Sequence, residues 1–193
     1  MEEEKGGEIV CNAHLCLAGP DPSSISDDPE GIACLGELAA LYDSLPHDVR
    51  ADVSLLLLPM KNLADNALMV NALQRSSFLI VQNSLEEGWG LTCLEAQFKR
   101  VCVIGTQTGV GLRSQIQDGV TGLLTQFPED PVSVAHSLLF GLTNDSARVA
   151  MSFNSQSHAV SGGLIFSQVD KWLSLLFAHH PTSTQAPPKA PLF

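Results

Sequence analysis

The sequence predicts an α/β fold of the Rossmann-like type, a doubly wound parallel sheet with helices on both faces. Short apolar runs bounded by turn residues alternate with longer stretches of helical periodicity. The run at 52–58 is so apolar that we expect both of its faces to be covered, as in a parallel sheet. The 193 residues, 45% of them hydrophobic, suffice for one such domain and are too few for two.

The predicted elements alternate from the N-terminal side onward. A short apolar strand ends at Gly19-Pro20, and a loop and a helix follow each later predicted strand except the one at 101–105. Strands are predicted at 13–18, 52–58, 78–82, 101–105 and 122–125. Helices are predicted at 30–44, 67–76, 91–99, 131–142, 146–158 and 164–177. This order indicates repeated strand-helix units and hence parallel pairing.

The last predicted helix is amphipathic. Its apolar stripe consists of Ile165, Val169, Trp172, Leu173 and Leu176. We interpret the stripe as core packing in preference to a membrane or partner surface.

Three segments are predicted along the chain: an acidic N-terminal segment at 1–12, one folded domain at 13–178 and a Pro-rich tail at 179–193. The tail is expected to be unstructured, as a linker or, less favoured, as a ligand for a proline-reading module.

Composition and charge exclude several functions. A net charge of −11 disfavours nucleic acid and anionic membranes as partners. The start of the chain lacks the features of a secretory signal, and the longest apolar run falls far short of the roughly 20 residues that span a bilayer, so we expect a cytoplasmic protein. The five cysteines are expected to be reduced, with Cys16, Cys34, Cys93 and Cys102 in the core. The cysteine and histidine spacings predict no metal site.

The segment 78–99 carries the chemistry. It is predicted to be a strand, a glycine-containing loop and a helix N-terminus, where Gly88 and Gly90 let the backbone approach a ligand. The unpaired N–H groups of the first helical turn would then bind a phosphate. Glu87 and Glu95 flank this point and could accept from sugar and ribose hydroxyls. Alternatively, the two glutamates only complement the helix dipole, at about 0.3–1 kcal/mol each.

Two weaker candidates lie outside this segment. Gly109-x-Gly111 lacks the third glycine of a dinucleotide fingerprint. Gln74-Arg75 could contact a nucleotide, although an arginine at a helix end is more often a dipole partner.

A set of motifs, taken in order, resembles the donor-binding half of the family-4 glycosyltransferases of the GT-B fold, and most closely their trehalose synthase branch. The motifs are Asn71-Ala72-Leu73-Gln74-Arg75, Val81-Gln82-Asn83-Ser84, Glu87-Gly88-Trp89-Gly90-Leu91-Thr92, Glu95-Ala96, Val103-Ile104-Gly105 and Arg113-x-Gln115-Ile116-x-Asp118-Gly119-Val120-x-Gly122. The resemblance covers roughly residues 15–176.

This resemblance implies a retaining transfer of glucose from a nucleoside-diphosphate glucose, the donor substrate, to a sugar acceptor without a cofactor. It implies that Glu87 is catalytic, binding the hexose, and that Glu95 binds the ribose. The implied donor-binding residues are Gly88, Trp89, Gly90, Leu91, Thr92, Glu95, Gly109 and Gly111. Gly109 and Gly111 correspond to the family's glycine-rich loop over the donor sugar, here interrupted by Val110.

The sequence also departs from the family. We find no counterpart of the N-terminal acceptor domain, or of the first donor-domain strand with its diphosphate-clamping Arg and Lys. One expectation is therefore an enzyme completed by a separate acceptor domain or in a homo-oligomer. The alternative is a non-catalytic nucleotide-sugar-binding module or a remnant with an interaction role. A flavodoxin-like domain for another nucleotide is a third, weaker hypothesis.

Overall fold

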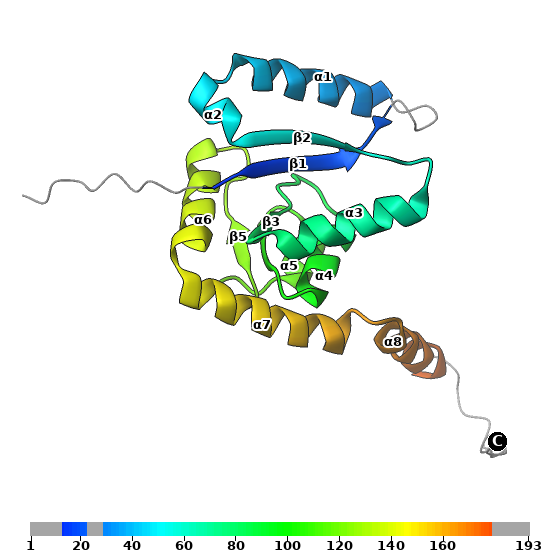
Figure 1. Cartoon of the computed structure of the whole chain (residues 1–193). Helices are drawn as coiled ribbons and strands as arrows, with labels where there is room; N and C mark the ends of the chain where they lie inside the picture. Colours follow the sequence, from blue (N-terminus) through cyan, green and yellow to red (C-terminus); the bar gives the residue numbers. More distant parts are fainter. Residues whose placement is uncertain (1–12, 23–28, 179–193) are drawn as a thin grey trace, which may run out of the picture.

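The computed structural model describes residues 13–22 and 29–178 (Figure 1), so the predicted segments 1–12 and 179–193 lie outside the described residues. The predicted α/β class is confirmed, and every strand pair among the described residues is parallel. The strands fall into two sheets, one of two strands and one of three.

The two-stranded sheet pairs β1 (Leu15–Pro20) with β2 (Val53–Leu58). Helices α1 (Pro29–Ser44) and α2 (His47–Ala51) lie beside it, on the side away from the other sheet (Figure 1). The prediction that residues 52–58 are covered on both faces is wrong, because Leu57 is 51% exposed. Neither α1 nor α2 has a buried residue, so these helices shield the sheet only partly.

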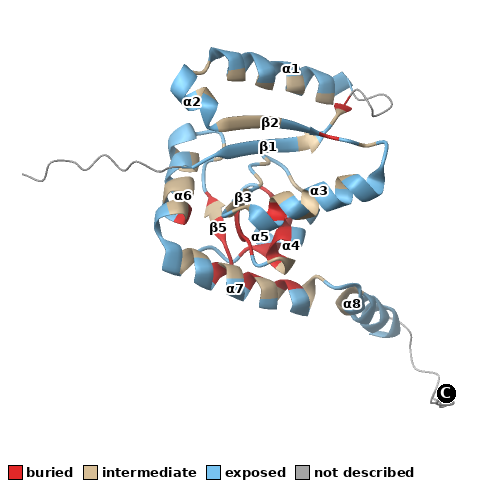
Figure 2. Cartoon of the chain, viewed as in Figure 1, coloured by how far each residue is buried: buried red, intermediate tan, exposed pale blue. Residues whose placement is uncertain are grey.

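The three-stranded sheet has the order β3 (Leu79–Val81), β4 (Cys102–Thr106), β5 (Leu123–Thr125). The central strand β4 is buried at every position. Figure 2 shows buried residues on β5, α4 and α7, which lie around it. Helix α3 (Leu63–Ser76) leads into β3, and α4 (Leu91–Phe98) connects β3 to β4.

The core consists of two clusters on opposite faces of β4, because successive strand side chains point to opposite sides. Helices α4 and α5 (Val110–Gln115) supply one face, and α7 (Asp145–Gly162) contributes to the other. The first cluster contains Cys93, Ala96, Val101, Val103, Leu112 and Ile116. The second contains Cys102, Ile104, Leu123 and Met151. Helices thus cover both faces of this sheet, as predicted.

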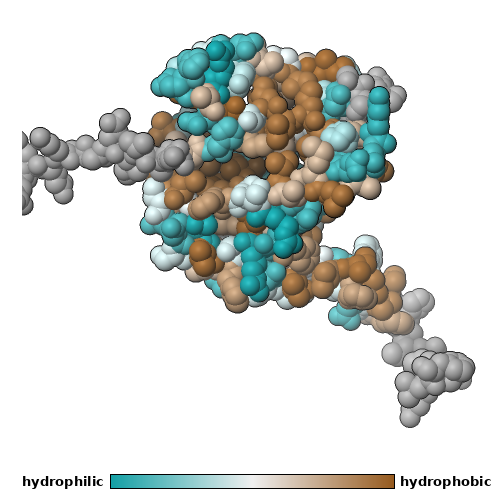
Figure 3. All heavy atoms as spheres, viewed as in Figure 1, coloured by the Kyte–Doolittle hydropathy of each residue, from teal (hydrophilic) through white to brown (hydrophobic). Residues whose placement is uncertain are grey.

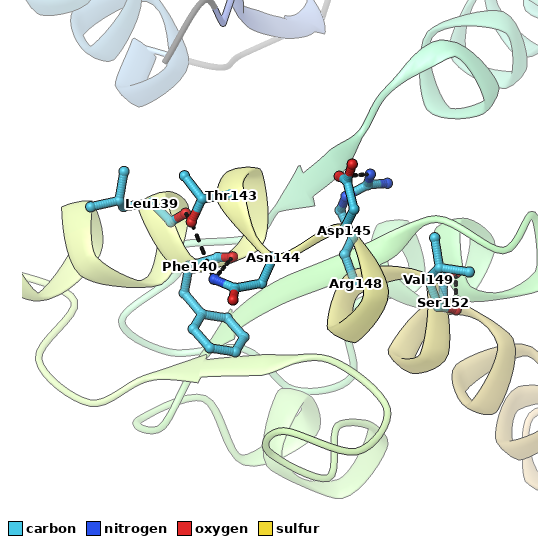
Figure 4. A network of polar contacts seen from close by, with 8 residues as sticks. All are labelled: Leu139, Phe140, Thr143, Asn144, Asp145, Arg148, Val149 and Ser152. Atoms are coloured by element: carbon cyan, nitrogen blue, oxygen red, sulfur yellow. Dashed lines mark hydrogen bonds and ion pairs between the residues drawn. The ribbon is translucent and has the colours of Figure 1, made fainter. Parts of the chain in front are cut away.

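The junction between α6 (Pro131–Thr143) and α7 is held by local hydrogen bonds (Figure 4). The side-chain amide of Asn144 donates to the carbonyl of Phe140 at 3.0 Å. One turn on, Arg148 pairs with Asp145 at 2.6 Å. These contacts are local to the turn between the two helices, whereas α7 packs against β4 through Met151.

The last helix, α8 (Ile165–Ala178), corrects a prediction. We predicted that its apolar stripe packs in the core, but the helix has no buried residue, and Trp172 is 62% exposed. Figure 1 shows why: α8 follows α7 and lies away from both sheets. No helix in the described part of the chain is both long and apolar enough to span a bilayer.

The prediction of four core thiols is half right. Cys93 and Cys102 are buried, whereas Cys16 and Cys34 are exposed because they belong to the poorly covered layer of β1 and α1. Apolar surface gathers over the part of the molecule where this layer lies (Figure 3). Burial raises the pKa of Cys93 to about 12 and that of Cys102 to about 11. Both thiols are therefore neutral at ordinary pH.

Candidate functional site

The loop between β3 and α4 folds around Glu87. Its Oε1 atom accepts hydrogen bonds from the backbone N–H groups of Trp89, at 3.2 Å, and Gly90, at 3.0 Å. Its Oε2 atom accepts from the side-chain amide of Gln82 at 3.4 Å. From the sequence, Glu87 is expected to accept hydrogen bonds from sugar hydroxyls. In the structure its half-buried carboxylate also shapes the loop.

Gly90 sets the direction in which α4 begins. Its backbone is left-handed, with φ 85° and ψ 66°, a conformation that favours glycine. A Cβ atom there would lie 2.7 Å from Cδ2 of Leu112, so a side chain at this position would force Leu112 to shift. No side chain caps α4, and the first N–H groups of a helix have no intrahelical partner. Leu91 and Thr92, which open the helix, are exposed, so their N–H groups can meet an anion.

The glycines at 109 and 111 are both buried. Gly109 precedes α5, and its N–H group donates to Oγ1 of Thr106 at 3.3 Å. Gly111 lies inside α5 and donates from its N–H group to the carbonyl of Glu87 at 2.9 Å. A Cβ atom at Gly111 would lie 2.4 Å from the Cα atom of Trp89. Gly111 therefore brings α5 directly against the Glu87 loop.

Gln115 also holds this loop, although no role could be predicted for it from the sequence. It is 3% exposed, and its amide donates to the carbonyl of Trp89 and, at 3.5 Å, to that of Gly90. Gln97, on α4, donates in turn to the carbonyl of Gln115 at 3.3 Å. The sequence signal was present in the Arg113-x-Gln115 motif, but spacing alone does not show that the glutamine points inward.

Glu95 lies on the exposed side of α4, one turn beyond the helix start. Its Oε2 atom accepts from the side-chain amide of Gln74 at 3.1 Å, and Oε1 of Gln74 accepts from Nζ of Lys99. Arg75, the neighbouring candidate, is exposed in the last turn of α3. Of the two neighbouring candidates, Gln74 is therefore buried and bonded to Glu95, whereas Arg75 faces solvent.

A hollow of about 560 Å³ lies past the carboxyl ends of β4 and β5, between Thr108 and the segment 126–131. Such ends are where parallel sheets commonly bind ligands. The side chain of Asn83 donates to the carbonyl of Pro128 at 2.9 Å, which ties the Glu87 loop to the rim of the hollow. None of the predicted site residues lines it. Within residues 13–22 and 29–178, no cluster of three His, Cys, Asp or Glu could hold a metal ion.

Comparison with known proteins bears on this arrangement. Residues 64–158 match the family described as "Glycosyl transferases group 1". Over 107 residues the chain is 35% identical to trehalose synthase of Thermococcus litoralis, and the match covers 55% of this chain and 25% of that protein. The chain therefore spans about a quarter of that relative's length.

Solved structures show the same fold. A sucrose-phosphate synthase from Thermosynechococcus elongatus superposes with a TM-score of 0.64 at 20% identity, covering 86% of this chain and 39% of that one. Anabaena HepE in complex with UDP-glucose superposes with a TM-score of 0.61 at 15% identity, covering 86% and 40%. These structural similarities show that the chain shares the fold of these solved structures.

Proposed function

We propose that the chain is the donor-binding half of a retaining glycosyltransferase, because residues 64–158 match the group 1 glycosyl transferases and the fold is that of the similar solved structures. In this proposal glucose passes from a nucleoside-diphosphate glucose to a sugar acceptor. The observation that carries the proposal is the uncapped start of α4, which the Glu87 loop presents with exposed Leu91 and Thr92.

The diphosphate is assigned to the start of α4. Two negative phosphates there would meet the free N–H groups and the positive end of the helix dipole. Gly90 and Gly111 support this assignment because, having no side chains, they allow the backbone of the loop to pack closely against α5. An anionic donor can bind at this point even though the chain carries a net charge of −11.

The two glutamates are assigned to the two sugars. Glu87 receives two backbone N–H bonds on one oxygen, so its orientation is set before a hexose arrives. A carboxylate oxygen can accept more than one hydrogen bond, which leaves capacity for a sugar hydroxyl. Glu95, a turn further along α4, is assigned to the ribose.

In the proposed transfer, the bond between the anomeric carbon and the diphosphate oxygen breaks, and negative charge builds on the departing phosphate oxygens. The hydroxyl oxygen of the acceptor forms the new bond to the anomeric carbon, and its proton passes to the departing diphosphate. The chain would stabilise that charge through the N–H groups of Leu91 and Thr92, which are already oriented before the reaction. A separate acceptor domain, or another subunit, would supply the second substrate.

A non-catalytic nucleotide-sugar-binding module is the second candidate. It is favoured by one observation: within the described residues, no lysine or arginine side chain forms a hydrogen bond or ion pair with the Glu87 loop or the first turn of α4. A diphosphate can bind to backbone dipoles alone, but its departure would be less well stabilised.

Titration calorimetry with ADP, UDP, GDP and their glucose conjugates tests the proposal. We expect weak binding of at least one of these nucleoside diphosphates and of its glucose conjugate. Glu87→Gln should weaken binding of the glucose conjugate and spare the free diphosphate, whereas Glu95→Gln should weaken both. Each lost charge-assisted hydrogen bond should cost about 1.5–3 kcal/mol.

Absence of heat with all six ligands at millimolar concentration would refute the proposal. Equal losses from both variants on both ligands would leave donor binding intact and refute only the separate assignment of Glu87 and Glu95.

A further inference from the structure

Gln74 is the one buried residue recorded for α3, a helix otherwise half-buried or exposed. It is 4% exposed, and a buried amide must find partners for both its donor and its acceptor. Gln74 satisfies both requirements at α4, through Glu95 within the helix and Lys99 at its C-terminal cap. In the chain, β3 separates α3 from α4. The amide is therefore a specific link between the two helices.

Chemistry fixes the orientation of this amide. An ionised carboxylate only accepts hydrogen bonds and an ammonium group only donates them, so Nε2 must face Glu95 and Oε1 must face Lys99. Glu95 lies on α4 and Lys99 caps its C-terminus four residues later, a spacing that permits a direct ion pair. Among the described residues no such direct pair is present, and the two charges meet through the Gln74 amide instead.

The bridge constrains one oxygen of Glu95. Gln74 binds Oε2, and no hydrogen bond to Oε1 occurs within the described part of the chain. An exposed glutamate on a helix would otherwise sample several rotamers, and fixing one of them on binding costs conformational entropy. Holding the carboxylate beforehand lowers that cost.

We propose that Gln74 is a positioning residue that orients the Glu95 carboxylate to accept hydrogen bonds from a nucleotide ribose. This inference rests on the proposed function, in which Glu95 binds the ribose. Lys99 completes the bridge by holding Oε1 of the amide, so that Nε2 points at Glu95. The competing explanation is that Gln74 only joins α3 to α4.

A double-mutant cycle separates these explanations. Gln74→Met keeps the length of the side chain and removes both hydrogen bonds. We expect it to weaken UDP binding about tenfold in the parent chain, as expected for loss of a hydrogen bond involving a charged group. In the Glu95→Gln background the same change should have less than a twofold effect, because the group that Gln74 positions has already lost its charge.

Gln156→Met is the matched control. Gln156, on α7, is likewise an amide that bridges to α4: it donates to the carbonyl of Phe98 at 2.7 Å and accepts from Arg100. It contacts the C-terminal end of that helix, away from Glu95. Its replacement should change UDP affinity less than twofold. A loss as large as that from Gln74→Met would show that any loosening of α4 weakens binding and would overturn the proposal.

An independent readout needs no ligand. In NMR spectra the side-chain amide protons of Gln74, identified by their disappearance in Gln74→Met, should exchange slowly with water. They should exchange faster in Glu95→Gln and in Lys99→Met. Fast exchange in the parent chain would overturn the bridge itself, whatever binds.

The remaining outcomes distinguish the positioning role of Gln74 from a structural role and from failure of the proposed function. Equal losses from Gln74→Met in the parent and Glu95→Gln backgrounds would assign Gln74 a purely structural role. An intact bridge in a chain that binds none of ADP, UDP and GDP would refute the proposed function, and the positioning role with it. An intact bridge, normal UDP binding and no effect of Gln74→Met would refute the positioning role alone.

Discussion

Gly111 is the residue at which α5 meets the Glu87 loop most closely. A methyl group there would lie 2.4 Å from the Cα atom of Trp89 and 2.5 Å from its nitrogen. Backbone atoms cannot move aside as a flexible side chain can. We therefore expect Gly111→Ala to destabilise the fold by about 1–3 kcal/mol in urea unfolding and to weaken nucleotide binding by displacing the loop.

Gly36→Ala is the control for this prediction. Gly36 lies within α1, and nothing stands within 4 Å of a Cβ atom placed there. Because alanine is the better helix former, this variant should be more stable by roughly 0.5–1 kcal/mol. Destabilisation by both variants to the same extent would show that the close contact at Gly111 does not govern the result.

The buried thiols predict how stability depends on alkaline pH. The ordinary thiol pKa is 9.0, and burial raises it to about 12 in Cys93 and about 11 in Cys102. Above pH 9 the unfolded chain therefore loses these protons while the folded chain keeps them, which favours unfolding. Stability should fall by up to about 1.4 kcal/mol per pH unit for each thiol between pH 9 and 11.

Urea unfolding at pH 8, 9, 10 and 10.5 measures this effect, with the Cys93→Ala, Cys102→Ala double variant as the reference for all other titrating groups. The parent should lose stability faster than the reference above pH 9. Parallel curves would show that the thiols have ordinary pKa values.

Maleimide labelling at pH 7 should modify the exposed Cys16 and Cys34 before Cys93 and Cys102.

At the scale of whole elements, α8 is predicted to add little to folding stability. Trp172→Ser and Leu176→Ser should each change the free energy of unfolding by less than about 0.5 kcal/mol, because both side chains are more than half exposed. Met151→Ala, by contrast, removes a core side chain that is 2% exposed and should cost about 2–5 kcal/mol. Losses above 2 kcal/mol at Trp172 would show that the α8 stripe packs against the protein in solution.

Most helices and strands could be predicted from the sequence because local signals define them. The strand predicted at 101–105 is observed at Cys102–Thr106, and the helix predicted at 30–44 at Pro29–Ser44. The short helices α2 and α5 were missed. Helices of five or six residues carry too little periodicity to detect, and α5 begins at Val110 between two glycines.

Burial was harder to predict than the helices and strands themselves. The stripe on α8 and the run in β2 have the pattern of core elements, and no local feature reveals how much of the molecule surrounds them. The same limit applies at the site. The loop and its glutamates follow from the motif, but the contacts of Gln74 and Gln115 depend on which elements pack together, and that is a tertiary property.

At the scale of the whole molecule, we predict no detectable glucose transfer by this chain alone. The departing diphosphate would be stabilised by backbone N–H groups without a clamping cation, and loss of one such stabiliser typically costs on the order of 10²–10³ in rate. Positioning of the acceptor would be absent as well. Release of nucleoside diphosphate, measured with and without glucose as acceptor, tests this expectation.

A second experiment co-expresses this chain with the N-terminal half of the Thermococcus litoralis relative, to supply an acceptor domain. Co-expression should restore measurable turnover if Glu87 and Glu95 are correctly assigned, and Glu87→Gln should abolish the restored activity. Robust transfer by the 193 residues alone would place the catalytic charge elsewhere in the chain.

The division into two sheets implies that the molecule opens in parts. Buried β4 should have the slowest amide hydrogen exchange, limited by global unfolding, because α4, α5 and α7 all pack around it. The exposed layer of β1 and β2 can separate without breaking those contacts. Its amides should exchange through smaller openings, and a protease should cut there while β4 is still folded. Unfolding monitored at these two sheets would then give two midpoints, so no single melting temperature would describe the protein.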